Sequence, residues 1–247
     1  GGGRGGSPGE FRPALTHWPR FLVAGDAALV VEFGDEINPE INRQVHRLAH
    51  ALAHRALPGL GEAVPSYRSL LVHYDPLRLS YAQVEAFVSG TLQHCQEMVL
   101  PEPRQVEVPT VYGGACGPDL EFVAAHAGLS VEEVVRLHAG AIYTVYMLGF
   151  TPGFTYLGGL PEAIVAPRLP TPRPSVPAGS VGIAGSQTGI YALATPGGWR
   201  LIGRTPLRLF DARQIPPAFV RPGDRVRFVP IPAEAFDALA AEAGRGT

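Results

Sequence analysis

Apolar positions in the first part of the chain recur with two different spacings, which predicts a mixture of strands and helices. Residues 27–33 form a β-branched and aromatic run that stops at Gly34, as a strand does where it meets a turn. Asn38 and Pro39 then supply an N-cap and a first helical residue. The apolar positions that follow recur every three or four residues, so a helix follows the strand.

The next segments complete a split β-α-β unit. The sequence predicts short strands at 61–65 and 69–74, a second helix from Ser80 to about residue 94, and a further strand at 106–111. The order is therefore β-α-β-β-α-β. We expect a small ferredoxin-like α/β domain over residues 20–112.

The second part of the chain changes to short strands separated by glycine and proline turns. A helical connector is predicted at 113–140, and residues 141–247 then end in an alternating strand at 225–229 and a helix at 234–242. Closely spaced short strands without intervening helices predict a closed or nearly closed β-barrel. The expected fold class is α+β, preceded by a glycine-rich leader at 1–19 that resembles an added linker.

The segment from Gly149 to Asp211 is rich in glycine and proline but also in large apolar side chains, which disordered linkers lack. Before Asp211 its one acidic residue is Glu162. Arginine forks and glycine-rich turns both suit carboxylate or phosphate, so the segment predicts a local anion site. Its arginines are Arg168, Arg173, Arg200, Arg204 and Arg208.

Arg200 and Arg204 are the first candidates for that anion, because a four-residue spacing on a strand directs both side chains to one face. Nearby amide, hydroxyl and backbone N–H groups would complete the site. An exposed barrel surface with solvated arginines is the alternative, and the residues leave both interpretations open. The predicted substrate- or anion-binding set is Arg200, Arg204, Gln187, Thr155, Tyr156, Gly197 and Gly198.

Composition excludes several functions. The chain has 247 residues, a net charge of −2 and no lysine, so it carries no general attraction for nucleic acid or anionic membranes and no Walker A or Schiff-base lysine. Two windows without charged residues, 137–161 and 174–199, are interrupted by glycine and proline and do not predict membrane spans. Two cysteines are too few for a disulfide scaffold, so we expect a reducing, cytoplasmic compartment.

Other reactive side chains fit structural roles better than catalytic ones. His46, His50 and His54 lie four residues apart and could share a helical face as metal ligands do, but no acid or cysteine joins them. A solvated helix face explains them, and we predict no metal. The sequence shows no activating base for Ser180 or Cys116, so the catalytic residues are left unassigned.

Long motifs distributed over both halves of the chain carry a family resemblance. They stand at 25–29 (GDAAL), 64–72 (VPSYRSLLV), 74–76 (YDP), 149–161 (GFTPGFTYLGGLP), 168–174 (RLPTPRP), 176–185 (VPAGSVGIAG), 187–191 (QTGIY) and 195–206 (TPGGWRLIGRTP). These motifs resemble the KipI-like family, which is also called the 5-oxoprolinase B subunit or allophanate hydrolase subunit 1.

The resemblance implies a cyclophilin-like barrel and a shared activity. Relatives of this kind act with a KipA-like protein, the C subunit of 5-oxoprolinase, and with a barrel-type A subunit in the ATP-dependent conversion of 5-oxoproline to glutamate. ATP would then be used by the assembled complex, with no cofactor expected on this chain alone. The alternative implied by the resemblance is a regulatory protein that binds and inhibits a sensor histidine kinase.

Overall fold

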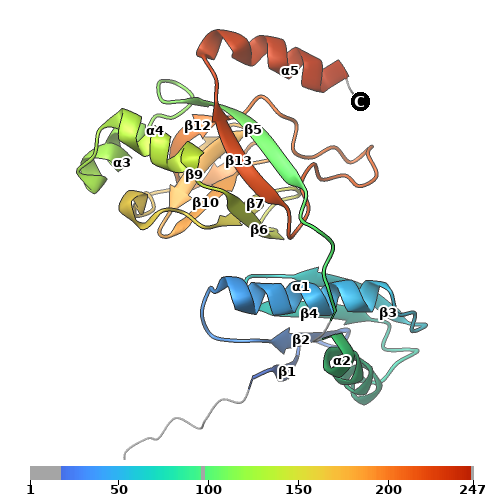
Figure 1. Ribbon diagram of the computed structural model, residues 1–247. Helices are drawn as coiled ribbons and strands as arrows, with labels where there is room; N and C mark the ends of the chain where they lie inside the picture. Colours follow the sequence, from blue (N-terminus) through green and yellow to red (C-terminus); the bar gives the residue numbers. More distant parts are fainter. Residues whose placement is uncertain (1–17, 96–97, 246–247) are drawn as a thin grey trace, which may run out of the picture.

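A computed structural model describes residues 18–95 and 98–245, which form two domains joined by one extended linker (Figure 1). The N-terminal domain is an antiparallel sheet in the order β1-β2-β4-β3, with two helices packed against it. Its strands are β1 (Arg20–Val23), β2 (Ala28–Glu32), β3 (Leu60–Pro65) and β4 (Ser69–Tyr74), and its helices are α1 (Pro39–Ala53) and α2 (Tyr81–Cys95).

The predicted local signals form these elements. The Asn38 side chain accepts a hydrogen bond from the backbone N–H of Glu40 at 2.8 Å and caps α1. Apolar residues of α1 and α2 pack with alternate residues of β2 and β4, so the core lies between the helices and one face of the sheet. The largest fully buried side chains there are Leu29, Leu48 and Leu70.

The strand predicted at 106–111 forms, but it does not complete the N-terminal sheet. It is β5 (Gln105–Tyr112), which pairs in parallel with β13 (Arg225–Pro230) and antiparallel with β12 (Arg200–Arg204) in the other domain. The edge position next to β2 is filled instead by β1. The expected boundary at residue 112 was therefore wrong, because a local apolar pattern predicts a strand but not its pairing partner.

The C-terminal domain is built on a closed barrel in the order β10-β7-β6-β13-β5-β12-β9. Its core contains Val145, Leu157, Ile183 and Phe228, all of which are buried. The fold class predicted from the sequence, an α+β chain with a barrel, is confirmed. The remaining barrel strands are β6 (Tyr143–Leu148), β7 (Thr155–Gly158), β9 (Ser180–Ala184) and β10 (Gln187–Ile190).

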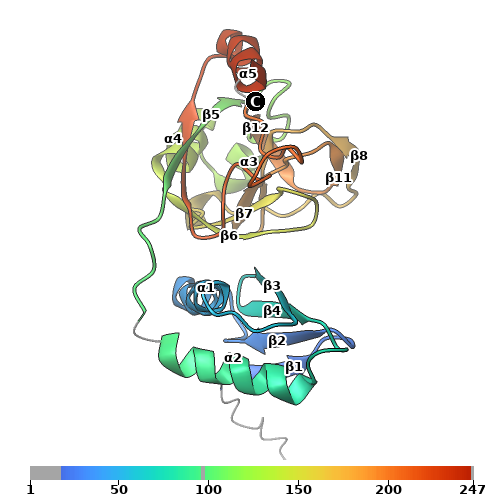
Figure 2. The ribbon, with the colours of Figure 1, turned by 90° about the vertical axis from the view of Figure 1, so that its right-hand side faces the viewer.

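The segment expected to act as a helical connector forms α3 (Leu120–Ala127) and α4 (Val131–Gly140), but these helices belong to the barrel. Val123 and Val134 are fully buried in the barrel core. Burial of their apolar faces explains why these helices pack onto the barrel instead of bridging two domains. The link between the domains is the stretch before β5 (Figures 1 and 2).

A small ribbon of β8 (Arg173–Val176) and β11 (Thr195–Gly197) lies beside the barrel (Figure 2). It helps to enclose a second apolar cluster, in which Phe154, Tyr191 and Trp199 are buried. A terminal helix, α5 (Phe236–Arg245), follows β13, as predicted apart from its bounds. Within 18–95 and 98–245, no helix is long and apolar enough to span a membrane.

Candidate functional site

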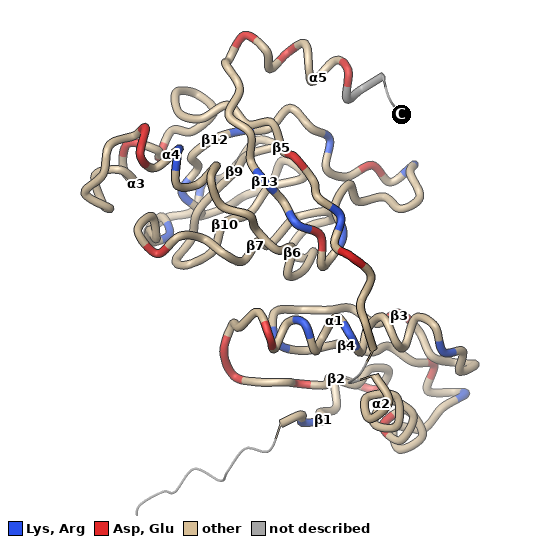
Figure 3. Tube along the Cα trace, viewed as in Figure 1, with Lys and Arg blue, Asp and Glu red and all other residues tan. Residues whose placement is uncertain are grey.

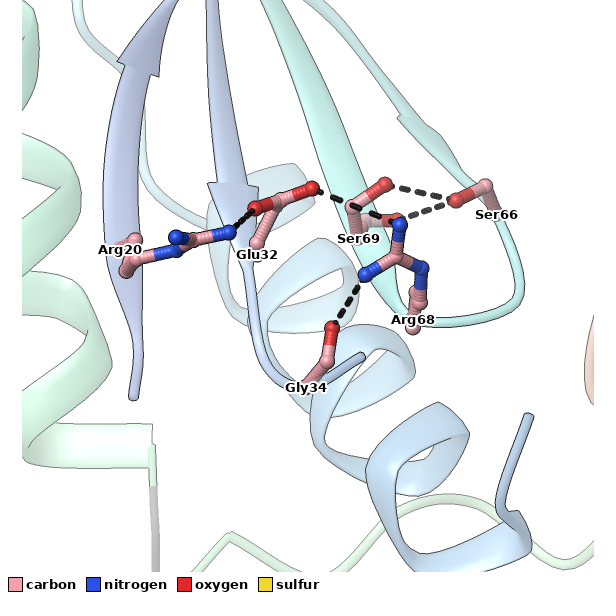
Figure 4. A network of polar contacts seen from close by, with 6 residues as sticks. All are labelled: Arg20, Glu32, Gly34, Ser66, Arg68 and Ser69. Atoms are coloured by element: carbon pink, nitrogen blue, oxygen red, sulfur yellow. Dashed lines mark hydrogen bonds and ion pairs between the residues drawn. The ribbon is translucent and has the colours of Figure 1, made fainter. Parts of the chain in front are cut away.

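The turn between β3 and β4 presents Tyr67 from the N-terminal domain to the barrel. Arg68 donates to the Gly34 carbonyl at 2.7 Å and lies 3.9 Å from Glu32, which also pairs with Arg20 at 2.6 Å (Figure 4). Arg68 directly follows Tyr67, so its contacts hold the turn against the sheet. The hydroxyl groups of Ser66 and Ser69 close the same turn by a 2.7 Å hydrogen bond.

Asn42 of α1 fixes this turn against the barrel. Its side-chain amide donates to the carbonyl oxygens of Ser66 at 3.0 Å, Tyr67 at 3.2 Å and Tyr146 at 3.4 Å. Tyr146 belongs to β6, so one amide group links both domains. Asn42 is 2% exposed, and buried polar groups of this kind are costly to leave unpaired.

Aromatic rings meet at this domain junction. The Tyr67 ring lies edge-on to Tyr146 and to Tyr156, with ring centroids 5.7 and 5.6 Å apart. Tyr156 continues the contact to Trp199 at 5.9 Å. The missing side chain of Gly189 makes room here, because a Cβ at that position would lie 2.9 Å from the Trp199 ring.

Gln187 gives this aromatic surface an amide. Burial raises the pKa of Tyr67 well above its usual range. The Gln187 side chain lies beside the Tyr67 hydroxyl and acts in the opposite direction, lowering that pKa by a smaller amount. The Tyr67 hydroxyl is buried without a hydrogen-bond partner of ordinary geometry among the described residues. The junction therefore carries two polar groups, the Tyr67 hydroxyl and the Gln187 amide, beside its aromatic rings.

Arg168 supplies the positive charge. Its guanidinium carbon lies 5.9 Å from the centroid of the Trp199 ring, and its charge acts to lower the pKa values of Tyr67, Tyr156 and Tyr191. Arg168 forms no ion pair with any residue that the structure describes. This exposed guanidinium therefore has no counter-charge among the described residues and lies near Tyr67, Tyr156 and Trp199.

The other arginines of the glycine- and proline-rich segment are not equivalent to Arg168. Asp119, which lies outside that segment, is 2.9 Å from Arg173 and 3.8 Å from Arg200. The Arg200 guanidinium also covers the Phe122 ring at 3.5 Å. The expectation that Arg200 faces a ligand is thus corrected, because Asp119 of the same chain supplies its counter-charge. Asp119 is far from Arg200 in the sequence, so the sequence did not indicate this pairing.

Arg204 lies apart from Arg200. Its Nε donates to the Ala178 carbonyl at 2.8 Å, and its guanidinium is 5.3 Å from the ring of Phe236 at α5. The pairing of β12 with β9 shifts register between Leu201 and Gly203. A bulge of this kind breaks the two-residue alternation, so the predicted common face of Arg200 and Arg204 was wrong.

Of the other predicted site residues, Tyr156 and Gln187 join the junction and three do not bring a side chain to it. Thr155 is fully buried and donates to the Gly153 carbonyl at 3.1 Å. Gly197 packs against the Tyr191 hydroxyl, where a Cβ would approach to 2.4 Å. The Gly198 carbonyl accepts from the Leu169 backbone at 2.8 Å, which holds the chain next to Arg168.

The histidines of α1 divide between two environments. The rings of His50 and His54 are 4.3 Å apart at the C-terminal end of the helix. His46 is instead largely buried between the domains, and burial lowers its pKa to about 4, which corrects the expectation of a solvated face. Within the described ranges, no group of three His, Cys, Asp or Glu side chains is placed to hold a metal.

Tyr67 and Asn42 are junction residues that sequence reasoning missed, and Arg168, although named among the arginines of its segment, was left out of the predicted binding set. Tyr67 stands in the motif at 64–72 between two predicted strands, flanked by serine and arginine. An aromatic residue at the tip of a tight turn has no core of its own, which is a signal for contact with another surface. The fold and this junction define a two-domain α+β protein that presents an aromatic and cationic surface where its barrel meets its smaller domain.

Comparison with known proteins places the chain more narrowly. Residues 19–220 match the family described as carboxyltransferase domain, subdomain C and D. The chain is 46% identical to the 5-oxoprolinase B subunit of Bacillus subtilis over 88% of its own length and 95% of the relative. It is 51% identical to the 5-oxoprolinase B subunit of Escherichia coli O157:H7 over 70% of its length and 79% of the relative.

A solved structure agrees with this assignment. The crystal structure of TTHA0988 superposes with a TM-score of 0.73 at 43% identity, covering 83% of this chain and 40% of that larger chain. The chain belongs to the carboxyltransferase subdomain C and D family, with relatives named as the B subunit of 5-oxoprolinase, and the KipI-like resemblance is confirmed.

Proposed function

We propose that this chain is the B subunit of a heteromeric ATP-dependent 5-oxoprolinase. In that role it forms a substrate site together with the KipA-like C subunit of the enzyme, and it works with an A subunit that completes the reaction. The observation that carries the proposal is the unpaired Arg168 above the Tyr67, Tyr156 and Gln187 surface, in a chain similar over most of its length to proteins of that name.

The chemistry of 5-oxoproline fits this surface. The molecule has a carboxylate, a lactam N–H, a lactam carbonyl and an apolar ring. Arg168 suits the carboxylate, Gln187 and the Tyr67 hydroxyl suit the lactam, and the rings of Tyr156 and Trp199 suit the ring carbons. The chain thus offers binding groups for the substrate but no lysine for a Walker A site, so we assign ATP to the assembled complex.

A partner surface lies next to the junction. Phe150, in the loop before β7, is 64% exposed and has a φ of 65°, which is unusual for a residue with a bulky side chain. The centroid of its ring lies 5.6 Å from that of Phe154, which belongs to the second apolar cluster. Strained, exposed aromatic residues occur at binding sites, and we assign Phe150 to the contact with the KipA-like partner.

The test is reconstitution with the A and C subunits from the same source. With all three chains we expect 5-oxoproline-dependent release of ADP and glutamate, and omission of this chain should abolish it. Phe150→Ser should weaken association with the KipA-like partner about ten-fold or more. Leu77→Ser, at a still more exposed position of the N-terminal domain, should not.

Undiminished glutamate release without this chain would refute the proposal. Equal losses from both serine variants would instead remove Phe150 from the partner surface. The regulatory alternative, inhibition of a histidine kinase, stays a prediction from the family resemblance, and a kinase autophosphorylation assay at equimolar protein tests it directly.

A further inference from the structure

A separate cavity of about 820 Å³ lies between α1, the linker before β5 and the entry to β13. Its volume is in the range of small-molecule sites. Asn42 and Tyr146 line it, so it adjoins the domain junction, but Tyr67, Tyr156, Gln187 and Arg168 do not take part in it. The cavity is therefore a different site from the one assigned to 5-oxoproline.

Arginine dominates the charged lining of this cavity. Two acids face five arginines, which are Arg43, Arg47, Arg104, Arg221 and Arg225. Figure 3 shows basic positions both along α1 and near the end of the barrel that faces it. A cavity with this excess attracts anions, because low-dielectric walls strengthen the field of the surrounding charges.

Part of this charge is already neutralised within the chain. Asp224 is held by Arg104, with Nε at 3.0 Å, and accepts the Arg221 backbone N–H at 2.7 Å. Arg43 pairs with Glu40 at 2.8 Å. Within the described parts of the chain, the side chains of Arg47, Arg221 and Arg225 have no ion pair.

A buried atom in the lining also lacks a partner. Nε of Arg47 is enclosed and forms no hydrogen bond with the described residues, whereas the His46 ring lies against the Tyr146 backbone. Both residues belong to α1, and both line the cavity. Buried polar groups are almost always satisfied in folded proteins, so the Arg47 guanidinium has hydrogen-bonding capacity left for an acceptor.

We propose that the cavity binds a small organic oxyanion, a carboxylate or a phosphate ester, between Arg47 of α1 and Arg225 of β13. Met98, Pro65 and Tyr146 provide apolar wall for the carbon part of such a molecule. The bound oxyanion bridges the two domains, because Arg47 and Arg225 come from different ones. Occupancy of this site thereby stabilises the arrangement that brings Tyr67 to the barrel. The inference does not depend on the proposed function.

The experiment is a titration of the full chain with inorganic phosphate and, separately, with succinate at constant ionic strength. Calorimetry measures the dissociation constant, and thermal unfolding measures the accompanying shift in Tm. Saturable binding of at least one anion is expected. A response to phosphate alone identifies a phosphate-ester site, and a response to succinate alone identifies a carboxylate site.

Arg225→Gln and Arg47→Gln should each weaken binding about ten-fold, the cost of a lost charged hydrogen bond. The matched control is Arg227→Gln, two residues further along β13, whose partner is Glu107 and whose side chain is outside the cavity. Arg227→Gln should bind as wild type does. Absence of saturable binding of either anion up to about 50 mM, or an equal loss in all three variants, would overturn the proposal.

Discussion

Asp119 shows how a single residue redirects the electrostatics of this chain. Its two carboxylate oxygens accept the Leu201 backbone N–H at 2.7 Å and the Arg173 guanidinium at 2.9 Å, with Arg200 next to them. The carboxylate therefore fastens α3 to β12 and to the small ribbon. Arg173 and Arg200 are needed for packing, which leaves Arg168 as the free arginine above the aromatic cluster.

Asp119→Ala should reduce the free energy of unfolding by about 3 kcal/mol, because it leaves a buried N–H and a partly buried guanidinium without their acceptor. Urea denaturation measures this loss. The control is Glu107→Ala, which removes an exposed carboxylate paired with Arg227 and should cost about 0.5 kcal/mol or less. Similar losses in the two variants would contradict the structural role of Asp119.

Sequence reasoning succeeded for local features and failed for distant pairings. The Asn38 cap and the strand at 69–74 follow from neighbouring residues, and the structure confirms both. The counter-charge of Arg200 lies 81 residues before it in the sequence. No local sequence pattern connects Arg200 with Asp119. The sequence therefore suggested that more arginines of this segment were free to bind a ligand than the structure leaves unpaired.

At the scale of elements, α4 is joined to the barrel strands through a buried histidine. His138 is fully buried, with Nδ1 2.8 Å from the Tyr112 hydroxyl and Nε2 3.0 Å from Thr188 Oγ1. Thr188 donates its hydroxyl hydrogen to the Gly182 carbonyl, so Nδ1 of the neutral ring accepts a hydrogen bond from the Tyr112 hydroxyl and Nε2–H donates one to Thr188. Burial lowers the pKa of His138 to about 3.

This network predicts a loss of stability in acid. The unfolded histidine has a pKa of 6.5, so its contribution is complete above that pH and is lost as the pH falls towards the folded value near 3. At pH 5 the loss attributable to His138 is about 2 kcal/mol. Unfolding free energies of wild type, His138→Gln and the exposed control His126→Gln, measured at pH 8 and pH 5, test this.

In His138→Gln, the unfolding free energy at pH 8 should exceed that at pH 5 by about 2 kcal/mol less than it does in the wild type. In His126→Gln, the difference in unfolding free energy should equal that of the wild type. An unchanged difference in His138→Gln would show that the buried ring is not the group responsible.

The barrel strands around this network were predicted in outline, but the bulge in β12 and the membership of β5 in the barrel were not. Both depend on which strands meet in space, and strand periodicity does not carry that information.

For the whole molecule, the position of the two domains decides whether the junction exists. Asn42 contacts carbonyl groups on both sides, and Tyr67 completes the aromatic cluster from the smaller domain. The arginine-lined cavity adjoins this contact through Asn42 and Tyr146. The motif at 64–72 identified the family, but its contact with the barrel became visible only in three dimensions.

Asn42→Ala should lower the free energy of unfolding by about 2 kcal/mol, since three carbonyl groups lose one shared donor. Gln44→Ala, on the exposed face of the same helix, should change it by about 0.5 kcal/mol or less. Denaturant titration measures both. If the two alanine variants are equally stable, the Asn42 amide does not hold the domains together.

The most direct test of the central claim is the steady-state rate of the reconstituted three-chain enzyme with Arg168→Gln in this chain. Loss of the guanidinium that we propose binds the carboxylate should raise the KM for 5-oxoproline about ten-fold or more, with the Tm of the isolated chain unchanged. Arg208→Gln, which removes an arginine paired with Asp211, should leave the KM at the wild-type value. A wild-type KM in Arg168→Gln, or the same rise in both variants, would contradict a substrate site at the domain junction.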